Sequence, residues 1–552
     1  MYLAKRTPFS DVNQGGTADS VALAEQSALF VLDREYISVK GVFVCINSFG
    51  NEVKGVFLIQ EVLIMNFSPT LNEVKKIAAT GKYNVLPVSC EILSDFTTPI
   101  ETMKILKNVS THCYMLESAQ ANETWGRYTF LGFDPKLEIT CRDGEMKAGN
   151  FKVRTDHPSE YLRQLLADYK SPRFDHRPSF TGGLVGYFSY DYLAYSEPSV
   201  KRVVQDTEAF RDVDLMLFDK VIAFDHLKQK IILIVNMPLD DVEVGYNKAV
   251  MELQQLLELI RHGEKKNEAG GRLLGEVTPL FDKEQFCGMV EKAKHHIREG
   301  DIFQIVLSNR LSAPFEGSLL NTYRVLRTIN PSPYMFYFSG TDVEVAGASP
   351  ETLVKLENGV LHTFPLAGTR PRGKTKEEDK ALETELLADK KELAEHNMLV
   401  DLGRNDLGKI SRFGTVQVEK LHSIERFSHV MHIGSTVRGE IDDHHDALDA
   451  IEAVLPAGTL SGAPKIRACQ LIGELENNKR GIYGGAIGYI DFTGNMDTCI
   501  AIRIAYKKNG KVFVRSGAGI VADSVPEKEY EECLNKAKAS LKALHLAQED
   551  EI

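Results

Sequence analysis

The sequence predicts an α+β fold, in which strands and helices follow one another irregularly instead of repeating as βαβ units. Short apolar runs bounded by turn residues indicate many strands, most densely over 84–155 and between 303 and 364. Amphipathic segments, such as 242–261 and 281–299, indicate helices between the groups of strands. Together these patterns favour packed layers of sheet and helix around a shared core.

The composition is that of an ordinary globular protein able to bury a large core, since 43% of the 552 residues are hydrophobic and 26% are charged. The net charge of −12 argues against a broad nucleic-acid surface. The longest apolar runs, around 41–46 and 55–65, are too short to span a bilayer. The eight cysteines form no CxxC pair and no signal-peptide pattern is visible, so a cytoplasmic location is expected.

Four parts are expected along the chain. Residues 1–64 are polar at first and then weakly patterned, which indicates an N-terminal extension, either disordered or preceding the true start; a small genuine element is the alternative. Residues 262–276 are charged and glycine-rich, as is typical of a linker. They would join an N-terminal half, 65–261, to a C-terminal half, 277–552.

Two predicted helices carry pairs of glutamates at helical spacing. One helix, expected over most of 386–410, places Glu392 and Glu395 on the same face, and a second, near the C-terminus, does so with Glu529 and Glu532. Like charges on one face repel each other, so a cation between them would be stabilising. Oxygen ligands suit Mg²⁺ better than Zn²⁺. A solvated acidic surface is the alternative for both helices.

Glycine-containing stretches at 365–373, 455–465 and 516–523 are expected to be loops that bring backbone N–H groups close to an anion, or else ordinary turns. None of them matches a Walker or a Rossmann motif. The similar strings GGLVGY, at 182–187, and GGAIGY, at 484–489, indicate two equivalent strands of a duplicated sheet, or a chance similarity.

Three side chains in apolar surroundings are further candidates. Arg503 alternates with apolar residues, and a buried arginine needs either a structural glutamate or the carboxylate of a substrate. Tyr483, before the GGAIGY strand, and His432, between apolar residues, are either packing residues or part of a site.

Six motifs in one order carry a resemblance to the chorismate-utilising enzymes, and most closely to the anthranilate-forming branch, component I. They are ASPE, PLAGTRPRG, KELAEHNMLVDLGRND, PAGTLSGAPK, GGAIGY and DSVPEKEYEE. The resemblance runs from Met65 to near the C-terminus and leaves residues 1–64 outside. It implies antiparallel sheets that pack orthogonally, with helices outside and two interleaved halves.

The resemblance also implies a metal site. A Mg²⁺ ion would be held by Glu395 and Glu532, with Glu392 and Glu529 acting behind them or through water. The metal would hold the ring carboxylate of chorismate.

For the remaining chemistry, the resemblance implies that Glu351 of the ASPE motif is the general acid and that His432 lies near the elimination centre. A protonated glutamate near pH 7 requires burial or nearby carboxylates to raise its pKa. The residues expected to bind the substrate are Gly368, Thr369, Tyr483, Arg503, Gly517, Ala518 and Gly519.

Two positions distinguish the branches of the family. Relatives that add water carry a lysine where this chain has Gln304, and an amide cannot serve as a general base. Relatives that form aminodeoxychorismate carry a nucleophilic lysine where this chain has Ala367. Ammonia is therefore the expected nucleophile, and anthranilate and pyruvate are the expected products, in the first committed step of tryptophan biosynthesis. The alternatives are an aminodeoxychorismate synthase component I and a catalytically silent, tryptophan-binding regulatory subunit.

Feedback inhibition by tryptophan is implied as well, through the LES sequence and the NPSPYMF sequence. The expected inhibitor site comprises Leu116, Glu117, Ser118, Pro333, Tyr334, Met335 and Cys499. No Cys–His glutaminase pattern is visible, so a separate glutamine amidotransferase subunit, component II, is expected to supply ammonia within a hetero-oligomer. Neither a nucleic acid nor a membrane is expected as a partner.

Overall fold

The computed structural model describes residues 66–118, 126–201, 205–266, 268, 270–427 and 430–548. The chain separates into a unit of residues 1–64 and a second unit from Met65 onward. The predicted N-terminal extension lies outside the described residues. Every helix and strand that the structure describes belongs to the second unit.

The first of two antiparallel sheets has fourteen strands. In the order of their pairing they are β1 (Phe67–Ser68), β2 (Val85–Leu93), β11 (Lys230–Pro238), β10 (Lys220–Asp225), β4 (Tyr128–Phe133), β3 (Cys113–Glu117), β15 (Tyr334–Ser339), β16 (Glu344–Ser349), β25 (Ile504–Lys508), β26 (Lys511–Ile520), β14 (Gln304–Glu316) and β12 (Arg272–Leu273), with β13 (Thr278–Pro279) and β22 (Gly462–Ala463) also paired to β14.

The second antiparallel sheet has twelve strands. In the order of their pairing they are β19 (Leu366–Pro371), β21 (Val430–Glu440), β18 (Val360–Thr363), β17 (Thr352–Glu357), β24 (Met496–Ile500), β23 (Ala486–Asp491), β8 (Gly183–Phe188), β9 (Val213–Phe218), β5 (Leu137–Arg142), β6 (Glu145–Ala148) and β7 (Phe151–Arg154), with β20 (Gln417–Arg426) paired to β21. Two large antiparallel sheets with intervening helices confirm the α+β class.

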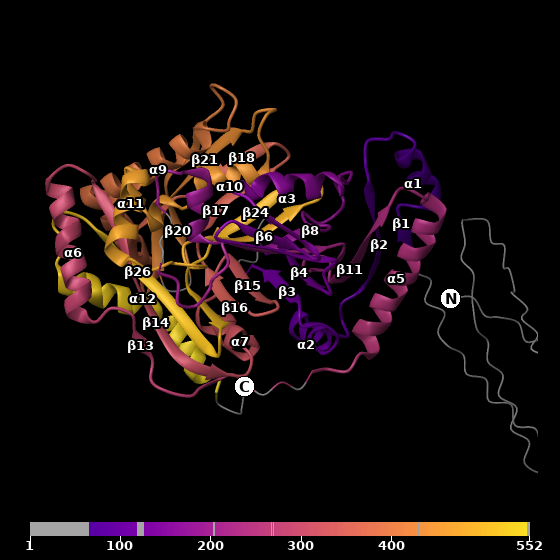
Figure 1. Cartoon of the computed structure of the whole chain (residues 1–552), viewed down its shortest axis with the longest axis horizontal. Coiled ribbons are helices and arrows are strands. Elements are labelled where there is room, and N and C mark those ends of the chain that lie inside the picture. Colours follow the sequence, from indigo (N-terminus) through magenta and orange to yellow (C-terminus); the bar gives the residue numbers. More distant parts are fainter. Residues whose placement is uncertain are drawn as a thin grey trace, which may run out of the picture. The chain divides into compact units, whose positions relative to one another are not determined.

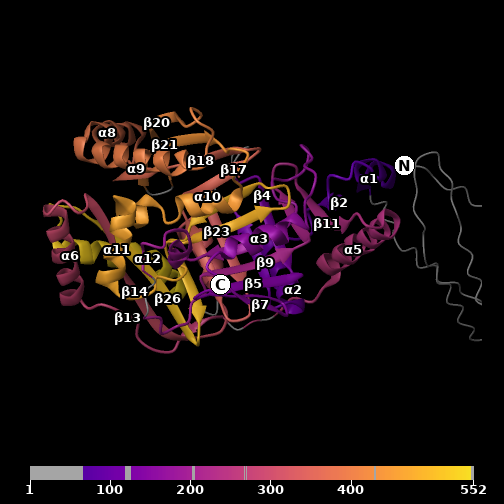
Figure 2. The same cartoon turned by 45° about the horizontal axis from the view of Figure 1, so that its top comes forward.

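The helices pack on the outer faces of the sheets. They are α1 (Leu71–Ala78), α2 (Pro99–Val109), α3 (Pro158–Ala167), α4 (Leu193–Ser196), α5 (Val242–His262), α6 (Lys283–Arg298), α7 (Leu320–Ile329), α8 (Lys376–Ala388), α9 (Lys390–Gly408), α10 (Ala447–Val454), α11 (Lys465–Glu476) and α12 (Pro526–Leu546), with 3₁₀ helices η1 (Tyr190–Tyr192) and η2 (Gly458–Leu460). Figure 1 shows α5 beside β2 and β11, and α12 beside β26. Figure 2 shows α8 and α9 together with β20 and β21 at one edge. No helix of the described residues is both long and apolar enough to cross a membrane.

The core between the sheets is aromatic and aliphatic. Phe336 and Phe513 of the first sheet share one buried cluster with Val185, Met216 and Ile487 of the second. Separate clusters lie under the helices on the outer face of each sheet. This is the packing expected when each sheet buries alternate side chains on its two faces.

Both sheets take strands from both sides of the predicted linker, 262–276. The first sheet combines β1–β4, β10 and β11 with strands that follow the linker, and the second combines β5–β9 with β17–β21, β23 and β24. The linker itself contributes β12, which pairs with β14. The two halves on either side of it are interleaved, as expected.

The helix predicted over most of 386–410 is confirmed as α9; it begins at Lys390 because the Asp389 side chain accepts the N–H groups of Lys391 and Glu392, and α8 ends before it at Ala388. One local prediction was wrong. Two of the predicted glycine loops are largely strand. Residues 366–371 form β19, which pairs with β21, and residues 516–520 belong to β26, which pairs with β14. Local glycine content does not reveal such pairing partners.

The two similar glycine strings are neighbours in one sheet. Strands β8 and β23 pair antiparallel, and Gly186 lies opposite Gly488. Both glycines leave no room for a side chain, since a Cβ atom at either would lie within about 2 Å of a backbone carbonyl oxygen. The similarity therefore marks close backbone packing within one sheet.

The helix α5 allows a test of the core beneath the first sheet. Leu253 is fully buried on this helix, and Met251 on the same helix is 58% exposed. Replacing Leu253 with alanine should lower the free energy of unfolding by about 2–5 kcal/mol, because the surrounding side chains refill the space only in part. The urea midpoint of Leu253→Ala measures the loss, and Met251→Ala should stay within about 0.5 kcal/mol of the parent. Equal midpoints for the two variants would contradict this packing.

Candidate functional site

A cavity of about 760 Å³ is lined by α9, α12, β14, β19, β21 and β26. Of the residues predicted for catalysis, substrate binding and metal binding, it is lined by Gln304, Glu351, Gly368, Thr369, Glu392, Glu395, His432, Tyr483, Arg503, Gly517, Gly519, Glu529 and Glu532. Residues more than 200 positions apart in the chain thus meet around one space.

Ala518 is the one predicted substrate-binding residue that does not line the cavity. It lies near the C-terminal end of β26, opposite Leu307 of β14, and both side chains belong to a buried cluster on the other face of the sheet. Since successive residues of a strand point to opposite faces, Gly517 and Gly519 face the cavity and Ala518 faces away.

The acidic wall of the cavity consists of Glu392 and Glu395 on α9 and of Glu529 and Glu532 on α12. Burial, and then the neighbouring Glu395 carboxylate, raise the pKa of Glu392. Burial likewise raises the pKa of Glu529, and the Glu532 charge raises it further. Partly desolvated carboxylates that repel one another create a local demand for positive charge.

The donors of this wall fit a magnesium ion that keeps part of its water shell. Within the described residues, no three or more His, Cys, Asp or Glu side chains are grouped closely enough to hold a metal by themselves. Mg²⁺ is usually bound by only one or two carboxylates, and water and substrate complete its shell. One glutamate from each helix would therefore suffice, with the second member of each pair acting through water.

Neighbouring side chains also contact the acidic wall. Gln304 Nε2 donates to Glu395 Oε1 at 3.3 Å, and Lys536 Nζ lies 2.7 Å from Glu532 Oε1. The amide of Gln304 thus orients a carboxylate of the wall from the first residue of β14.

Glu351 is buried between β16 and β17, and burial raises its pKa to about 8. The Thr459 hydroxyl donates to Glu351 Oε1 at 3.1 Å, and Arg503 acts from farther away; both lower the pKa, but less than burial raises it. Glu351 therefore carries a proton near pH 7, as a general acid must.

His432 is held by the strand opposite. It lies on β21 across from Thr369 of β19, and its Nδ1 is 2.9 Å from the carbonyl oxygen of Gly368. Nδ1 must donate to that oxygen, which leaves Nε2 as an acceptor. Burial lowers the pKa of His432, so the imidazole is neutral near pH 7.

Arg503 faces the cavity from the connection between β24 and β25. Its backbone has φ +55°, a left-handed conformation that non-glycine residues adopt only at some cost. Within the described part of the chain, its guanidinium makes no hydrogen bond or ion pair to a protein carboxylate. A half-buried arginine that the described residues leave without such a partner, held in a strained conformation, is suited to bind an anionic ligand.

Tyr483 and the glycines of β26 complete the wall next to Arg503. A Cβ atom at Gly517 would lie 2.7 Å from the carbonyl oxygen of Leu307 and 3.0 Å from the Tyr483 hydroxyl. Glycine at this position therefore lets the tyrosine hydroxyl reach the strand. We call Tyr483, Arg503, Gly517 and Gly519 the anion-binding wall.

Some lining residues were missed in the sequence. Thr459 contacts Glu351, and Arg515, Lys391, Lys528 and Lys536 also line the cavity. Thr459 lies within the PAGTLSGAPK motif, so the motif could have indicated it. The lysines lie on the same helices as the glutamates and look like ordinary surface charges in the sequence.

All the residues predicted for the inhibitor site line a second cavity, of about 390 Å³. It is lined by Leu116, Glu117, Ser118, Pro333, Tyr334, Met335 and Cys499, among other residues. The Tyr334 hydroxyl donates to Asp497 Oδ1 at 2.8 Å and lies 2.9 Å from Thr352 Oγ1. Glu117 Oε2 accepts from Arg327 at 3.2 Å. Leu116 pairs with Phe336 across the strands β3 and β15, which brings the two predicted segments together.

Comparisons with known proteins show what the whole chain is similar to. A family described as chorismate binding enzymes matches residues 111–542. Anthranilate synthase component 1 of Acetivibrio thermocellus is 46% identical over 501 residues, covering 88% of this chain and 99% of that protein. The protein of the same name from Aquifex aeolicus (strain VF5) is 44% identical over 502 residues, covering 88% and 100%. The crystal structure of anthranilate synthase component I from Streptococcus pneumoniae TIGR4 superposes with a TM-score of 0.69 at 39% identity, covering 81% and 98%.

The raised pKa of Glu351 predicts a pH-dependent cost to stability. The folded chain keeps a proton on Glu351 up to about pH 8, whereas the unfolded chain loses it near pH 4.5. The free energy of unfolding must therefore fall as the pH rises between these values. Glu351→Gln removes this loss and should be more stable than the parent at pH 8, by as much as ~4 kcal/mol, with no such gain near pH 4.5.

Thermal unfolding at both pH values measures this difference. Glu357→Gln is the control: although burial alone would raise the pKa of Glu357, Lys355 and Arg173 hold it low, so this variant should lose stability at pH 8. A Glu351→Gln variant that is no more stable at pH 8 than the parent would show that the carboxyl group is ionised there.

Proposed function

This chain belongs to the chorismate-binding enzymes, in the anthranilate synthase component I group, and we propose that it converts chorismate and ammonia into anthranilate and pyruvate. The observation that carries the proposal is the pairing of two unlike walls in one cavity. Chorismate has two carboxylates: the anion-binding wall suits one of them, and the acidic wall, through a bridging cation, suits the other.

The anion-binding wall would hold the carboxylate of the enolpyruvyl arm. The guanidinium of Arg503 can grip a carboxylate at two points, and the Tyr483 hydroxyl can donate to it. Gly517 and Gly519 let that carboxylate approach the backbone of β26. Gly368 and Thr369 of β19 would lie along the ring.

The acidic wall would hold Mg²⁺ through Glu395 and Glu532, with Glu392 and Glu529 behind them. When bound, the ion would supply positive charge that fixes the ring carboxylate and neutralises the repulsion among the glutamates. Gln304, which donates to Glu395, would help to orient this wall.

Glu351 and His432 would share the proton transfers. Addition of ammonia to the ring displaces a ring hydroxyl, and hydroxide is a poor leaving group, so protonated Glu351 would deliver a proton and water would leave. In the second step a ring proton must be removed while the enolpyruvyl arm departs as pyruvate. Neutral His432, with Nε2 as an acceptor, is suited to receive that proton. The balance is chorismate plus ammonia giving anthranilate, pyruvate and water.

Ammonia is the nucleophile that fits the chain best. Both Gln304 and Ala367 line the cavity, and neither can act as a base or as an amine nucleophile at these positions. A partner of the glutamine amidotransferase type, component II, would release ammonia from glutamine within a hetero-oligomer. The second cavity would bind tryptophan and inhibit turnover. The cytoplasmic location stays a prediction from the sequence.

One assay tests the reaction directly. The purified chain, given chorismate, Mg²⁺ and ammonium at mildly alkaline pH, should produce anthranilate fluorescence, and a chelator should remove it. Glutamine without the partner should not replace ammonium. Pyruvate release with another aromatic product would favour an aminodeoxychorismate synthase, and no consumption of chorismate would favour a silent regulatory subunit.

The metal assignment predicts which glutamates are needed for turnover. Glu395→Gln and Glu532→Gln should each lower kcat/KM by about 100-fold or more, because each removes a charge that would hold the ion at the reacting substrate. Tryptophan binding should remain, since the second cavity contains neither residue. The control is Glu531→Gln, the exposed neighbour of Glu532 on α12. Turnover unchanged in Glu395→Gln would overturn the assignment.

The inhibitor site predicts a separable effect. Ser118→Phe places a large ring in the second cavity and should relieve tryptophan inhibition while turnover is retained, because Ser118 does not line the first cavity. Ser118→Thr adds little volume and should stay sensitive. Inhibition curves for both variants against tryptophan decide the point, and strong inhibition of Ser118→Phe would contradict this site.

A further inference from the structure

A buried triad of Arg480, Glu476 and Arg515 lies directly behind the anion-binding wall. Glu476 Oε1 is 2.6 Å from Arg480 Nη2, and Glu476 Oε2 is 2.7 Å from Arg515 Nη2. All three side chains are almost completely buried, and two guanidinium groups share one carboxylate. Arg515 also lines the large cavity, so the triad is in direct contact with the site.

The hydrogen bonds of the triad fix the segments that carry the site. Arg480 donates to the carbonyl oxygens of Val306 in β14 and Leu460 in η2, both at 2.7 Å. Leu460 directly follows Thr459, which contacts Glu351. The triad thus connects two segments that line the cavity, β14 through Val306 and η2 through Leu460.

Ser308 joins the triad to the strand pair beneath the site. Its backbone N–H and its hydroxyl donate to Glu476 Oε1 at 2.7 Å and 3.0 Å, and Arg515 Nε donates to the Ser308 hydroxyl at 2.8 Å. Ser308 pairs with Gly517 of the anion-binding wall across β14 and β26. The position of Gly517 therefore depends on the hydrogen bonds by which Glu476 holds Ser308.

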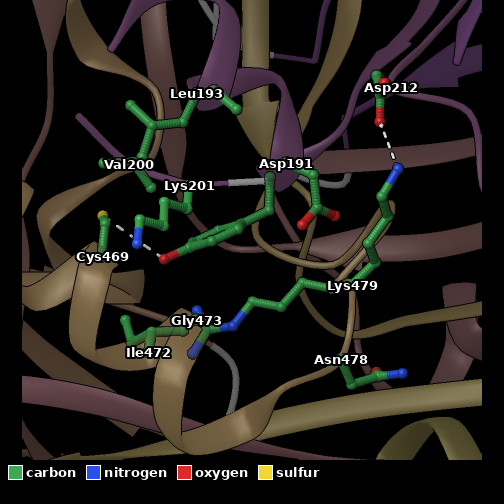
Figure 3. Close-up of a pocket in the computed structure, with 13 residues that line it drawn as sticks. Asp191, Leu193, Val200, Lys201, Asp212, Cys469, Ile472, Gly473, Asn478 and Lys479 are labelled. Atoms are coloured by element: carbon green, nitrogen blue, oxygen red, sulfur yellow. Dashed lines mark hydrogen bonds and ion pairs between the residues drawn. The ribbon is translucent and has the colours of Figure 1, made fainter. Parts of the chain in front are cut away.

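The loop before Tyr483 is fixed from its other side. Lys479 Nζ lies 2.6 Å from Asp143 and 3.4 Å from Asp212, and Asn478 Oδ1 accepts from Arg515 at 2.9 Å. Figure 3 shows Lys479 reaching Asp212, with Asn478 nearby, at a small cavity of about 30 Å³ that Arg480 also lines. The guanidinium of Arg480 lies 6.0 Å from the ring of Tyr483 and 4.4 Å from that of Tyr190. This loop thus delivers Tyr483 to the anion-binding wall in a fixed position.

We propose that Glu476, Arg480 and Arg515 act as positioning residues for the carboxylate that the anion-binding wall receives. The proposal rests on the proposed function, since that carboxylate belongs to chorismate. A buried ion triad that served stability alone would have no specific effect on substrate affinity.

Two variants test the proposal without touching a predicted contact of the substrate. Arg480→Lys keeps the charge but cannot reach Glu476, Val306 and Leu460 together. Ser308→Ala removes the hydroxyl that joins Glu476 to Arg515. The affinity for chorismate, from calorimetric titration and from KM with ammonium, should weaken about tenfold in Arg480→Lys and about threefold in Ser308→Ala, while kcat changes less than KM.

The matched control is Arg211→Lys, at another largely buried arginine, which pairs with Glu138, Asp214 and Asp342 and does not line the cavity. It should lower the melting temperature and leave the KM for chorismate unchanged. If Arg480→Lys and Ser308→Ala also lose only stability, with chorismate affinity within twofold of the parent, the triad is merely structural and the proposal fails. A parent chain that binds chorismate but forms no anthranilate would refute the proposed function, while the affinity measurements would still decide the role of the triad.

Discussion

The antiparallel pairing of β14 with β26 is the constraint on which the rest of the site depends. It places Gln304 and Val306 on the same face as Gly517 and Gly519, and it turns Ala518 and Leu307 into the core behind them. Helix α11 packs against β14 and brings Glu476 to Ser308 and Arg515, and helix α12 packs against β26 and brings Glu532 to the cavity. A shift of one residue in this register would exchange the two faces and remove both walls of the cavity.

The large cavity brings together charged side chains that would otherwise be solvated. Within the described residues Arg503 has no hydrogen bond or ion pair to a carboxylate, and burial and mutual repulsion raise the pKa values of Glu392 and Glu529. A ligand of opposite charge would relieve both arrangements. The buried proton of Glu351 follows the same pattern, since folding holds it in a neutral state that the proposed reaction would use.

The sequence revealed most of the cavity residues through motifs, and the reasons are local. Glu392 and Glu395 share a helix face by spacing alone, and glycines at 517 and 519 permit close approach of the backbone wherever they lie. Spacing places Arg480 four residues from Glu476, but it could not reveal Arg515, 39 residues from Glu476, or Ser308, 168 residues from it. It also could not reveal that Asp389 caps α9, or that the glycine-containing residues 366–371 and 517–520 pair as strands, because both outcomes depend on hydrogen-bond partners that the sequence pattern does not assign.

The place of β26 in the first sheet links the site to the integrity of a sheet edge. This strand lies between β25 and β14, and it carries part of the anion-binding wall. Without β26, one long edge of β14 would keep unpaired N–H and C=O groups. A chain in which this pair has not formed therefore has an exposed strand edge and no binding cavity.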